Sequence, residues 1–280
     1  RLLDTGTLYV ARFDDDGKGR WLPLRHGEKY PNGALTADNG FTSQGEVVIR
    51  CRQAADLAGA TKMDRPEWIA VHPESGEVYV TLTNNGKRGT PEAPGLNAAN
   101  PRPENHFGHI VRWRENRHDA ASTAFEWDIF ALAGDPLNPD PNKQGNMRGD
   151  AYGSPDGLWF DPGGRLWIQT DVSTSVLNKG DHANLGNNQM LVADVKSGET
   201  RRFLTGPKGC ELTGITATPD GKTLFVNIQH PGETASERAD PANPTAVSAW
   251  PANQFPQAVG GRPRSATIVI TRPDGKPVAA

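Results

Sequence analysis

The sequence predicts an all-β fold of the β-propeller type, and three observations support this. A hairpin pattern occurs three times, in which a short apolar strand, a turn with Pro and Gly, and a second apolar strand follow one another. Further strand-like segments come after each hairpin. The 280 residues include 31 Gly and 23 Pro, a composition that suits short strands joined by many turns.

The three hairpins are the most regular elements of the sequence. They lie at residues 68–82 (WIAVHPESGEVYVTL), 157–170 (GLWFDPGGRLWIQT) and 214–229 (GITATPDGKTLFVNIQ). In each turn Pro fixes φ and Gly permits a positive φ, which allows the chain to reverse tightly. We therefore expect each hairpin to form the inner strand pair of a propeller blade.

Outer strands are predicted after each hairpin. They lie at residues 109–114 and 124–131, at 189–195 and 200–204, and at 266–271. A hairpin with two outer strands, repeated at intervals of roughly 60 to 90 residues, is typical of propeller blades that carry insertions. A barrel or a sandwich does not predict strands grouped in this way.

The first part of the chain predicts a strand pair that has no inner hairpin. Residues 7–13 (TLYVARF) and 19–24 (GRWLPL) form this pair, which gives about three and a half blades, too few for a closed propeller. We interpret residues 1–280 as one partial propeller domain, the C-terminal half of a larger protein. The missing N-terminal half, or a second chain, would complete the ring. Residues 46–51 (EVVIRC) are expected to form a strand and residues 53–60 (QAADLAGA) a short helix.

Charge and hydropathy exclude two classes of partner. Lys and Arg number 30 and Asp and Glu 33, so the net charge of −3 gives no basic surface for nucleic acid or an anionic membrane. No apolar run approaches the ~18 residues that span a bilayer.

The two cysteines, Cys51 and Cys210, form no CxxC motif. We expect both to be buried thiols, and a bridge between them in an oxidising compartment is the alternative.

Three acidic residues stand at equivalent points of the repeats, immediately before an inner strand. They are Glu67 (DRPEWIAV), Asp156 (GSPDGLWF) and Glu211 (GCELTGIT). Repetition predicts that they lie on one rim of the fold and converge on its axis. Clustered carboxylates repel one another unless cations neutralise them, and oxygen ligands of this kind suit Ca²⁺ or Fe³⁺. The alternative is that each residue caps its own turn in isolation.

Further polar residues lie where the hairpins end. Asp171 follows the second hairpin, Asn84 and Asn85 hold the matching place in the first, and His230 holds it in the third. Because the ends of inner hairpins can lie at either rim of a propeller, these residues are weaker candidates for the site.

Arg65 is the candidate phosphate-binding residue. It lies two positions before Glu67, so in an extended segment both side chains project to the same side. An Arg beside a metal-binding Glu gives a phosphate site both its bidentate fork and its cations. The alternative is a surface Arg that is simply paired with that Glu.

Motifs of several other enzyme classes are absent from the sequence. It contains no nucleophile elbow, P-loop, dinucleotide fingerprint or HExxH zinc motif. His106 and His109 (NHFGHI) have a spacing of three, which suits a metal pair on a helix but not in this strand context. We expect these two histidines to be structural.

Several of these motifs together resemble the PhoX family of bacterial alkaline phosphatases. The matching segments are TLYVARF, GATKMDRPEWIAVHP, VYVTLTNN, NHFGHI, SPDGLWFD, LWIQTD and TPDGKTLFVNIQHPGE, in this order along nearly the whole chain. The segments DRPEW and LFVNIQHPGE are quite specific, whereas SPDGL alone is a common turn.

The resemblance implies a six-bladed propeller with a calcium–iron cluster that hydrolyses phosphate monoesters, in a periplasmic or secreted enzyme. It implies that Arg65 is catalytic and grips phosphate, and that Glu67, Asp156, Glu211 and, more weakly, Asp171 bind metal. The family also has an N-terminal PWGTWLTCEE-like segment that supplies a Cys and a carboxylate to the cluster. This chain lacks that segment and neither of its cysteines replaces it, so the rest of the protein or a second chain would have to complete the cluster.

Two other functions remain as alternatives. Calcium-dependent lactonases of the regucalcin and gluconolactonase type also gather Glu, Asn and Asp around one cation, and GLWFDPGGRLWIQTD resembles their blades. A non-catalytic propeller that serves as a binding module is the second alternative, because half of the ring is expected to lie outside the chain. Arg65 beside Glu67 favours phosphate over the lactonase alternative.

Overall fold

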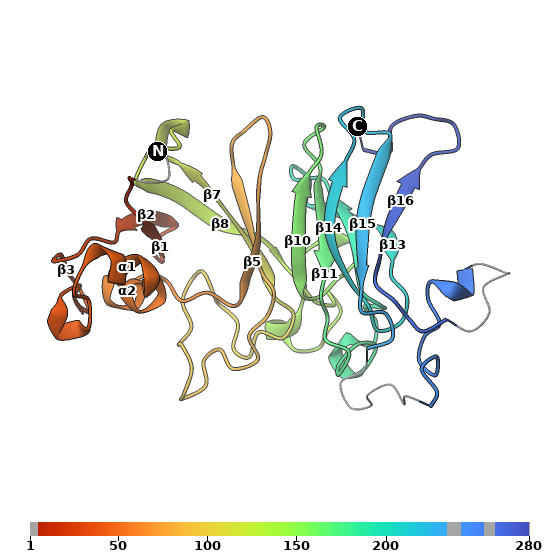
Figure 1. Cartoon of the computed structure of the whole chain (residues 1–280), viewed down its shortest axis with the longest axis horizontal. Coiled ribbons are helices and arrows are strands. Elements are labelled where there is room, and N and C mark those ends of the chain that lie inside the picture. Colours follow the sequence, from red (N-terminus) through yellow and green to blue (C-terminus); the bar gives the residue numbers. More distant parts are fainter. Residues whose placement is uncertain (1–4, 234–241, 255–260, 280) are drawn as a thin grey trace. The chain divides into compact units, whose positions relative to one another are not determined.

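The computed structural model describes residues 5–233, 242–254 and 261–279 (Figure 1). The chain divides into two compact units, which are described separately. The first comprises Arg1–Met63, Leu96–Pro101 and Trp113–Asp128, and the second comprises Asp64–Gly95, Arg102–Arg112 and Ile129–Ala280. The described residues are mostly β and form several sheets, which confirms the predicted class at that level.

The elements of the described residues follow the chain in this order. The strands are β1 (Tyr9–Phe13), β2 (Lys18–Pro23), β3 (Lys29–Tyr30), β4 (Gly33–Ala34), β5 (Pro66–Val71), β6 (Val78–Leu82), β7 (His109–Glu115), β8 (Ala124–Leu132), β9 (Arg148–Gly149), β10 (Pro155–Phe160), β11 (Leu166–Thr170), β12 (Gln189–Ala193), β13 (Glu199–Thr205), β14 (Glu211–Ala217), β15 (Thr223–Gln229) and β16 (Ala266–Thr271). The α-helices are α1 (Gln44–Ile49) and α2 (Cys51–Ala58), and 3₁₀ helices lie at Ala37–Asn39, Asn116–His118, Pro141–Lys143, Gly180–His182 and Ala252–Gln254.

The first unit contains the N-terminal strand pair. β1 and β2 form an antiparallel hairpin with Phe13 opposite Gly19, and β2 continues onto β8 with Gly19 opposite Phe125. The Phe125 ring occupies the space that a side chain at position 19 would need, so the close approach of these strands requires glycine. The expectation that this pair forms half a blade without partner strands in the chain is therefore wrong, because β2 pairs with β8.

The two α-helices correct a second expectation. The segment EVVIRC, expected to be a strand, lies in α1 and the start of α2. Ser43 caps α1, since its Oγ accepts a hydrogen bond from the backbone N–H of Glu46. Val47 is fully buried among apolar side chains of this unit, whereas Val48 and Ile49 are exposed. Capping and one well-packed face therefore override the strand propensity of the β-branched residues.

The second unit contains the three predicted hairpins, and all three are confirmed. β5 pairs with β6, β10 with β11, and β14 with β15, each pair antiparallel. Outer strands follow as predicted, since β12 and β13 extend the second hairpin and β16 extends the third. β7 and β8 follow the first hairpin along the chain, and β7 lies beside β6. The short strand β9 pairs in parallel with β13, and the sequence had not predicted it.

The sheet that starts with β10 is buried on both faces. Leu158 and Ile168 belong to one apolar cluster, which also contains Tyr79 of β6. Trp167 points to the opposite face and packs in a second cluster with Leu212 of β14. Alternate side chains of one strand thus serve two cores. β10 accordingly lies beside both β5 and β14, which brings the first strands of the three hairpins together (Figure 1).

Two further predictions can be compared with the structure. Cys51 and Cys210 are both free thiols, so the bridge between them is not formed. Cys210 is buried as expected, but the expectation of a buried thiol is wrong for Cys51, which is partly exposed.

Among the described residues, no helix has the length and apolar character that crossing a lipid bilayer requires.

Candidate metal and phosphate site

A repeated backbone turn leads into the first strand of each of the three hairpins. The residue two positions before each of the three acidic residues has a left-handed backbone, with φ of 51° at Arg65, 49° at Ser154 and 68° at Gly209. Left-handed non-glycine residues are uncommon and cluster at functional sites, where the surrounding structure must hold them in place. The same turn therefore delivers an acidic side chain to the start of β5, β10 and β14.

Backbone hydrogen bonds hold two of these turns in the same way. The carbonyl of Arg65 accepts from the N–H of Thr83 at 3.0 Å, and the carbonyl of Ser154 accepts from the N–H of Asp171 at 2.9 Å. Thr83, rather than Asn84, is therefore the first-sheet counterpart of Asp171. Because each hairpin begins and ends at the same edge, Asp171 lies at the rim that carries the three acidic residues.

Irregular strand pairing surrounds two of the acidic residues. The register shifts between Pro66 and Ile69 in β5 and between Pro155 and Leu158 in β10. Such bulges change the direction of side chains and are frequent beside active sites. Glu67 and Asp156, which directly follow these prolines, lie within the two irregular stretches.

Three carboxylates converge at this rim and are called the acidic group here: Asp156, Asp171 and Glu211. One oxygen of each lies within 4.8 Å of the others. Asp156 is 7% exposed and Glu211 9%, so at least two of these carboxylates are well shielded from water. Convergence of buried carboxylates is unfavourable unless protons or cations compensate the charge.

Burial and mutual repulsion raise the pKa of two carboxyls of the acidic group. Burial, followed by the negative charges of Glu211, Asp171 and Glu67, raises the pKa of Asp156 to about 7. Burial and the charge of Glu211 raise the pKa of Asp171 to about 6, and Arg65 and His230 partly oppose that shift. Strongly shifted acids grouped in this way are typical of functional sites.

The acidic group fits a bound cation. Oδ1 of Asp156 is buried and has no hydrogen-bond partner among the described residues, which is costly for a polar atom unless something else binds it. Oε2 of Glu211 accepts one hydrogen bond, from Nε2 of Gln229 at 2.8 Å. Carboxylate oxygens at this spacing are the donor set that Ca²⁺ and other hard cations prefer.

Arg65 lies at the edge of the acidic group. Its Nη2 is 3.4 Å from Oε1 of Glu67 and 3.6 Å from Oδ2 of Asp171, and its Nη1 donates to Oδ1 of Asn84 at 3.3 Å. About half of its side chain is exposed. A guanidinium carries five N–H donors, so these few long contacts leave donors available for an anion.

The structure places the other predicted residues around this centre. Glu67 is not one of the three converging carboxylates; it pairs with Arg65, and its charge acts on Asp156. Nε2 of His230 lies 3.5 Å from Oε2 of Glu211. His109 is buried, with Nδ1 3.0 Å from Nδ2 of Asn105, which agrees with the structural role expected for it.

A buried network lies directly behind Arg65, and sequence reasoning missed it. Asp64 and Arg88 are both fully buried, and Arg88 Nε donates to Oδ1 of Asp64 at 2.7 Å. The amides of Asn85 and Asn105 also donate to this carboxylate, at 2.9 and 3.0 Å. Of these two adjacent residues, Asp64 is therefore fixed in the interior, whereas Arg65 faces the site. The Asp that precedes the Arg in DRPEW was the available signal.

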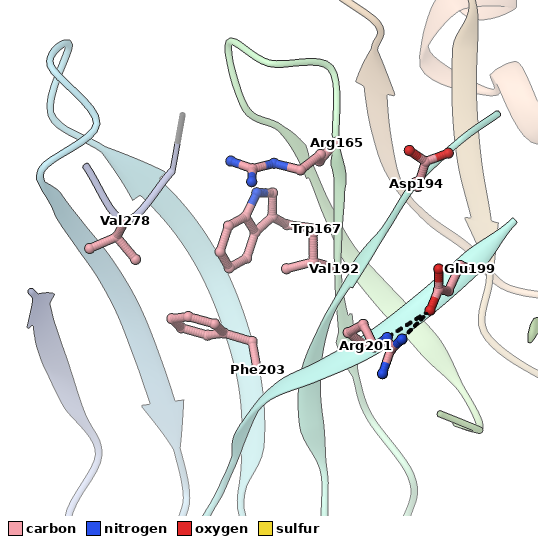
Figure 2. A pocket seen from close by; sticks show the side chains of 8 residues that line it. All are labelled: Arg165, Trp167, Val192, Asp194, Glu199, Arg201, Phe203 and Val278. Carbon is pink, nitrogen blue, oxygen red and sulfur yellow. Dashed lines mark hydrogen bonds and ion pairs between the residues drawn. The ribbon is translucent and has the colours of Figure 1, made fainter. Parts of the chain in front are cut away.

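A second hollow in the same unit is a weaker candidate for a functional site. It has a volume of about 350 Å³ and is lined by the eight residues drawn in Figure 2. Its two arginines are both paired, Arg165 with Asp161 at 2.7 Å and Arg201 with Glu199 at 2.8 Å. Within the part of the chain that the structure describes, this hollow has no group of converging carboxylates like the acidic group.

Comparison with known proteins identifies the family. A family model described as alkaline phosphatase PhoX matches residues 1–232. Among solved structures, Pseudomonas fluorescens PhoX in complex with vanadate, a transition state analogue, matches with a TM-score of 0.84 and 49% sequence identity. This similarity covers 99% of the chain but 46% of that protein, so the chain spans less than half the length of the solved relative. No curated protein sequence matches the chain. The family model covers most of the chain, which therefore belongs to the PhoX family of alkaline phosphatases.

Proposed function

We propose that the protein hydrolyses phosphate monoesters and that this chain supplies Arg65 and the acidic group to the active site. The observation that carries the proposal is the position of Arg65, whose half-exposed guanidinium lies 3.6 Å from a carboxylate of the acidic group. A phosphate dianion needs positive charge on several sides, and cations held by carboxylates next to a half-exposed guanidinium provide it. The vanadate complex of the P. fluorescens relative supports a site for a phosphoryl group.

Cation binding is the second part of the proposal. Asp156, Asp171 and Glu211 would hold the metal, with Glu67 as a further ligand at the margin. By family resemblance the cations are Ca²⁺ and Fe³⁺, and when bound they would supply Lewis-acid stabilisation of negative charge on the phosphoryl oxygens. The unpartnered oxygen of Asp156 and the raised pKa of its carboxyl support this assignment.

Arg65 has a separate role in this proposal. It carries only donors and cannot bind a cation, so it would contact the phosphoryl oxygens directly. Its hydrogen bonds would strengthen as negative charge redistributes on those oxygens, which makes the contact worth more in the transition state than in the ground state. Asp171 holds the guanidinium beside the acidic group, so anion and cations would bind as neighbours.

The architecture belongs to the proposal as well. The three consecutive sheets, with β10 between β5 and β14, support a β-propeller whose remaining blades come from the part of the protein outside this chain. We also propose that the enzyme acts in the periplasm or outside the cell, as the family resemblance implies.

Substrate comparison tests the proposed reaction. The full-length protein, loaded with Ca²⁺ and Fe³⁺, should hydrolyse p-nitrophenyl phosphate but neither glucono-δ-lactone nor bis(p-nitrophenyl) phosphate at a comparable rate. Turnover of the lactone alone would instead favour the lactonase alternative, and turnover of none of them would favour a binding module.

A further inference from the structure

The orientation of the Arg65 guanidinium depends on more than its acidic neighbours. Both carboxylate contacts, with Glu67 and with Asp171, are made by the same nitrogen, Nη2. Contacts to one nitrogen fix the position of a guanidinium but leave the plane free to turn. The Nη1 side is held by Oδ1 of Asn84, at 3.3 Å. Two fixed nitrogens are needed for a bidentate fork to face an oxyanion in a defined direction.

Asn84 is itself held from both sides. Its Nδ2 donates to Oγ of Ser154 at 3.3 Å, and Ser154 is buried at the equivalent turn of the next sheet. Its neighbour Asn85 donates to the buried carboxylate of Asp64 at 2.9 Å. The pair Asn84–Asn85 therefore contacts the pair Asp64–Arg65 residue by residue, with one amide on the arginine and one on the aspartate.

Neutrality makes an asparagine suitable for this task. An amide oxygen accepts from the guanidinium without adding a negative charge, whereas an aspartate here would add to the repulsion within the acidic group and oppose an incoming phosphate. The amide also offers a donor to Ser154 at the same time, which a carboxylate cannot do.

We infer that Asn84 is a positioning residue for Arg65: it sets the plane of the guanidinium that binds the phosphoryl group, and it acts through Arg65 alone. The inference rests on the proposed function, and it deepens it. Misplacing a catalytic group by about 1 Å can cost roughly a hundredfold in rate, so a measurable effect is expected.

A double-mutant cycle tests this inference in the full-length protein. We would measure kcat and KM for p-nitrophenyl phosphate, and the Kd for inorganic phosphate, in wild type, Asn84→Ala, Arg65→Ala and the double variant. Asn84→Ala should lower kcat/KM roughly tenfold to a hundredfold and weaken phosphate binding. In the Arg65→Ala background the same change should alter both quantities by less than about twofold. Ser154→Ala, which removes the anchor of Asn84 but leaves its contact with Arg65, should cost less than Asn84→Ala.

Controls separate positioning from folding. Metal content and Tm should match wild type in Asn84→Ala, and Asn39→Ala, which removes an amide that donates to the Ala34 carbonyl in the first unit, should leave turnover unchanged. An Asn84→Ala loss of equal size in both backgrounds, or no loss at all, overturns the inference while the proposed function stands. A wild-type protein that neither binds phosphate nor turns over the ester removes the proposed function and the inference together.

Discussion

Oδ2 of Asp171 lies 3.6 Å from Nη2 of Arg65, so the arginine contacts a carboxylate of the acidic group as well as Glu67 of β5. This contact joins the two halves of the proposed site, the cation-binding carboxylates and the anion-binding guanidinium. Arg65 also opposes the rise in the pKa of Asp171, so the guanidinium favours the charged form of the carboxylate beside it.

Removal of Arg65 should affect the transition state more than metal binding. We expect Arg65→Ala to lower kcat/KM for p-nitrophenyl phosphate by about 10²–10³-fold, because one transition-state donor group is lost. Metal content, measured by elemental analysis, should stay at the wild-type level. Arg201→Ala is the matched control, since Arg201 is also exposed and paired with a glutamate two residues away. Equal effects of the two substitutions would contradict the role of Arg65.

Neutral replacement of the acidic group should release the cation. Glu211→Gln and Asp156→Asn keep the shape of each side chain but remove its charge, so both should lower bound metal and activity together. Glu67→Gln should lose less metal, because Glu67 lies at the margin of the cluster and is paired with Arg65. Calcium titration by calorimetry measures how much metal each variant binds. A larger loss of bound calcium in Glu67→Gln than in Asp156→Asn would contradict the expected order.

The raised pKa of Asp156 predicts the pH dependence of the metal-free protein. Its pKa rises from 3.8 to about 7, so the folded state binds this proton more tightly than the unfolded chain. The resulting stabilisation is present below about pH 4 and is lost as the pH rises to about 7. In EDTA, the Tm of Asp156→Asn relative to wild type should therefore rise on the order of 5 °C over this range. A Tm difference independent of pH would show that Asp156 does not titrate in this way.

The two cysteines should differ sharply in reactivity. Burial raises the pKa of the Cys210 thiol to about 12, so little thiolate forms near neutral pH, whereas Cys51 is partly exposed. Iodoacetamide should label Cys51 in the native protein and label Cys210 after denaturation. Mass spectrometry of labelled peptides gives the result directly, with Cys51→Ser as the control. Fast native labelling of Cys210 would contradict its buried position.

Local signals explain which parts of the architecture were predictable. The three hairpins carry Pro and Gly in their turns and alternating apolar strands, which are encoded within a dozen or so residues. The equivalent positions of Asp156 and Glu211 followed from this repetition. The strand prediction for EVVIRC was wrong. Its β-branched residues favour strands locally, but the Ser43 cap and the burial of Val47 stabilise a helix.

The remaining parts of the site depend on contacts between distant segments. The pairing of Asp64 with Arg88 joins residues that are 24 positions apart, and the bond from Asn84 to Ser154 spans 70. No spacing rule predicts such contacts from one sequence. The place of Asp171 became clear only from the strand register, which shows that a hairpin's two ends share one rim.

Metal-dependent turnover tests the central claim most directly. The full-length protein should hydrolyse p-nitrophenyl phosphate, lose this activity on dialysis against EDTA, and regain it when Ca²⁺ and Fe³⁺ are restored. The same cycle with Asp156→Asn should fail to restore activity, since a carboxylate of the acidic group is missing. Hydrolysis that survives complete removal of metal, or a metal-loaded wild type with no ester turnover, would contradict the account.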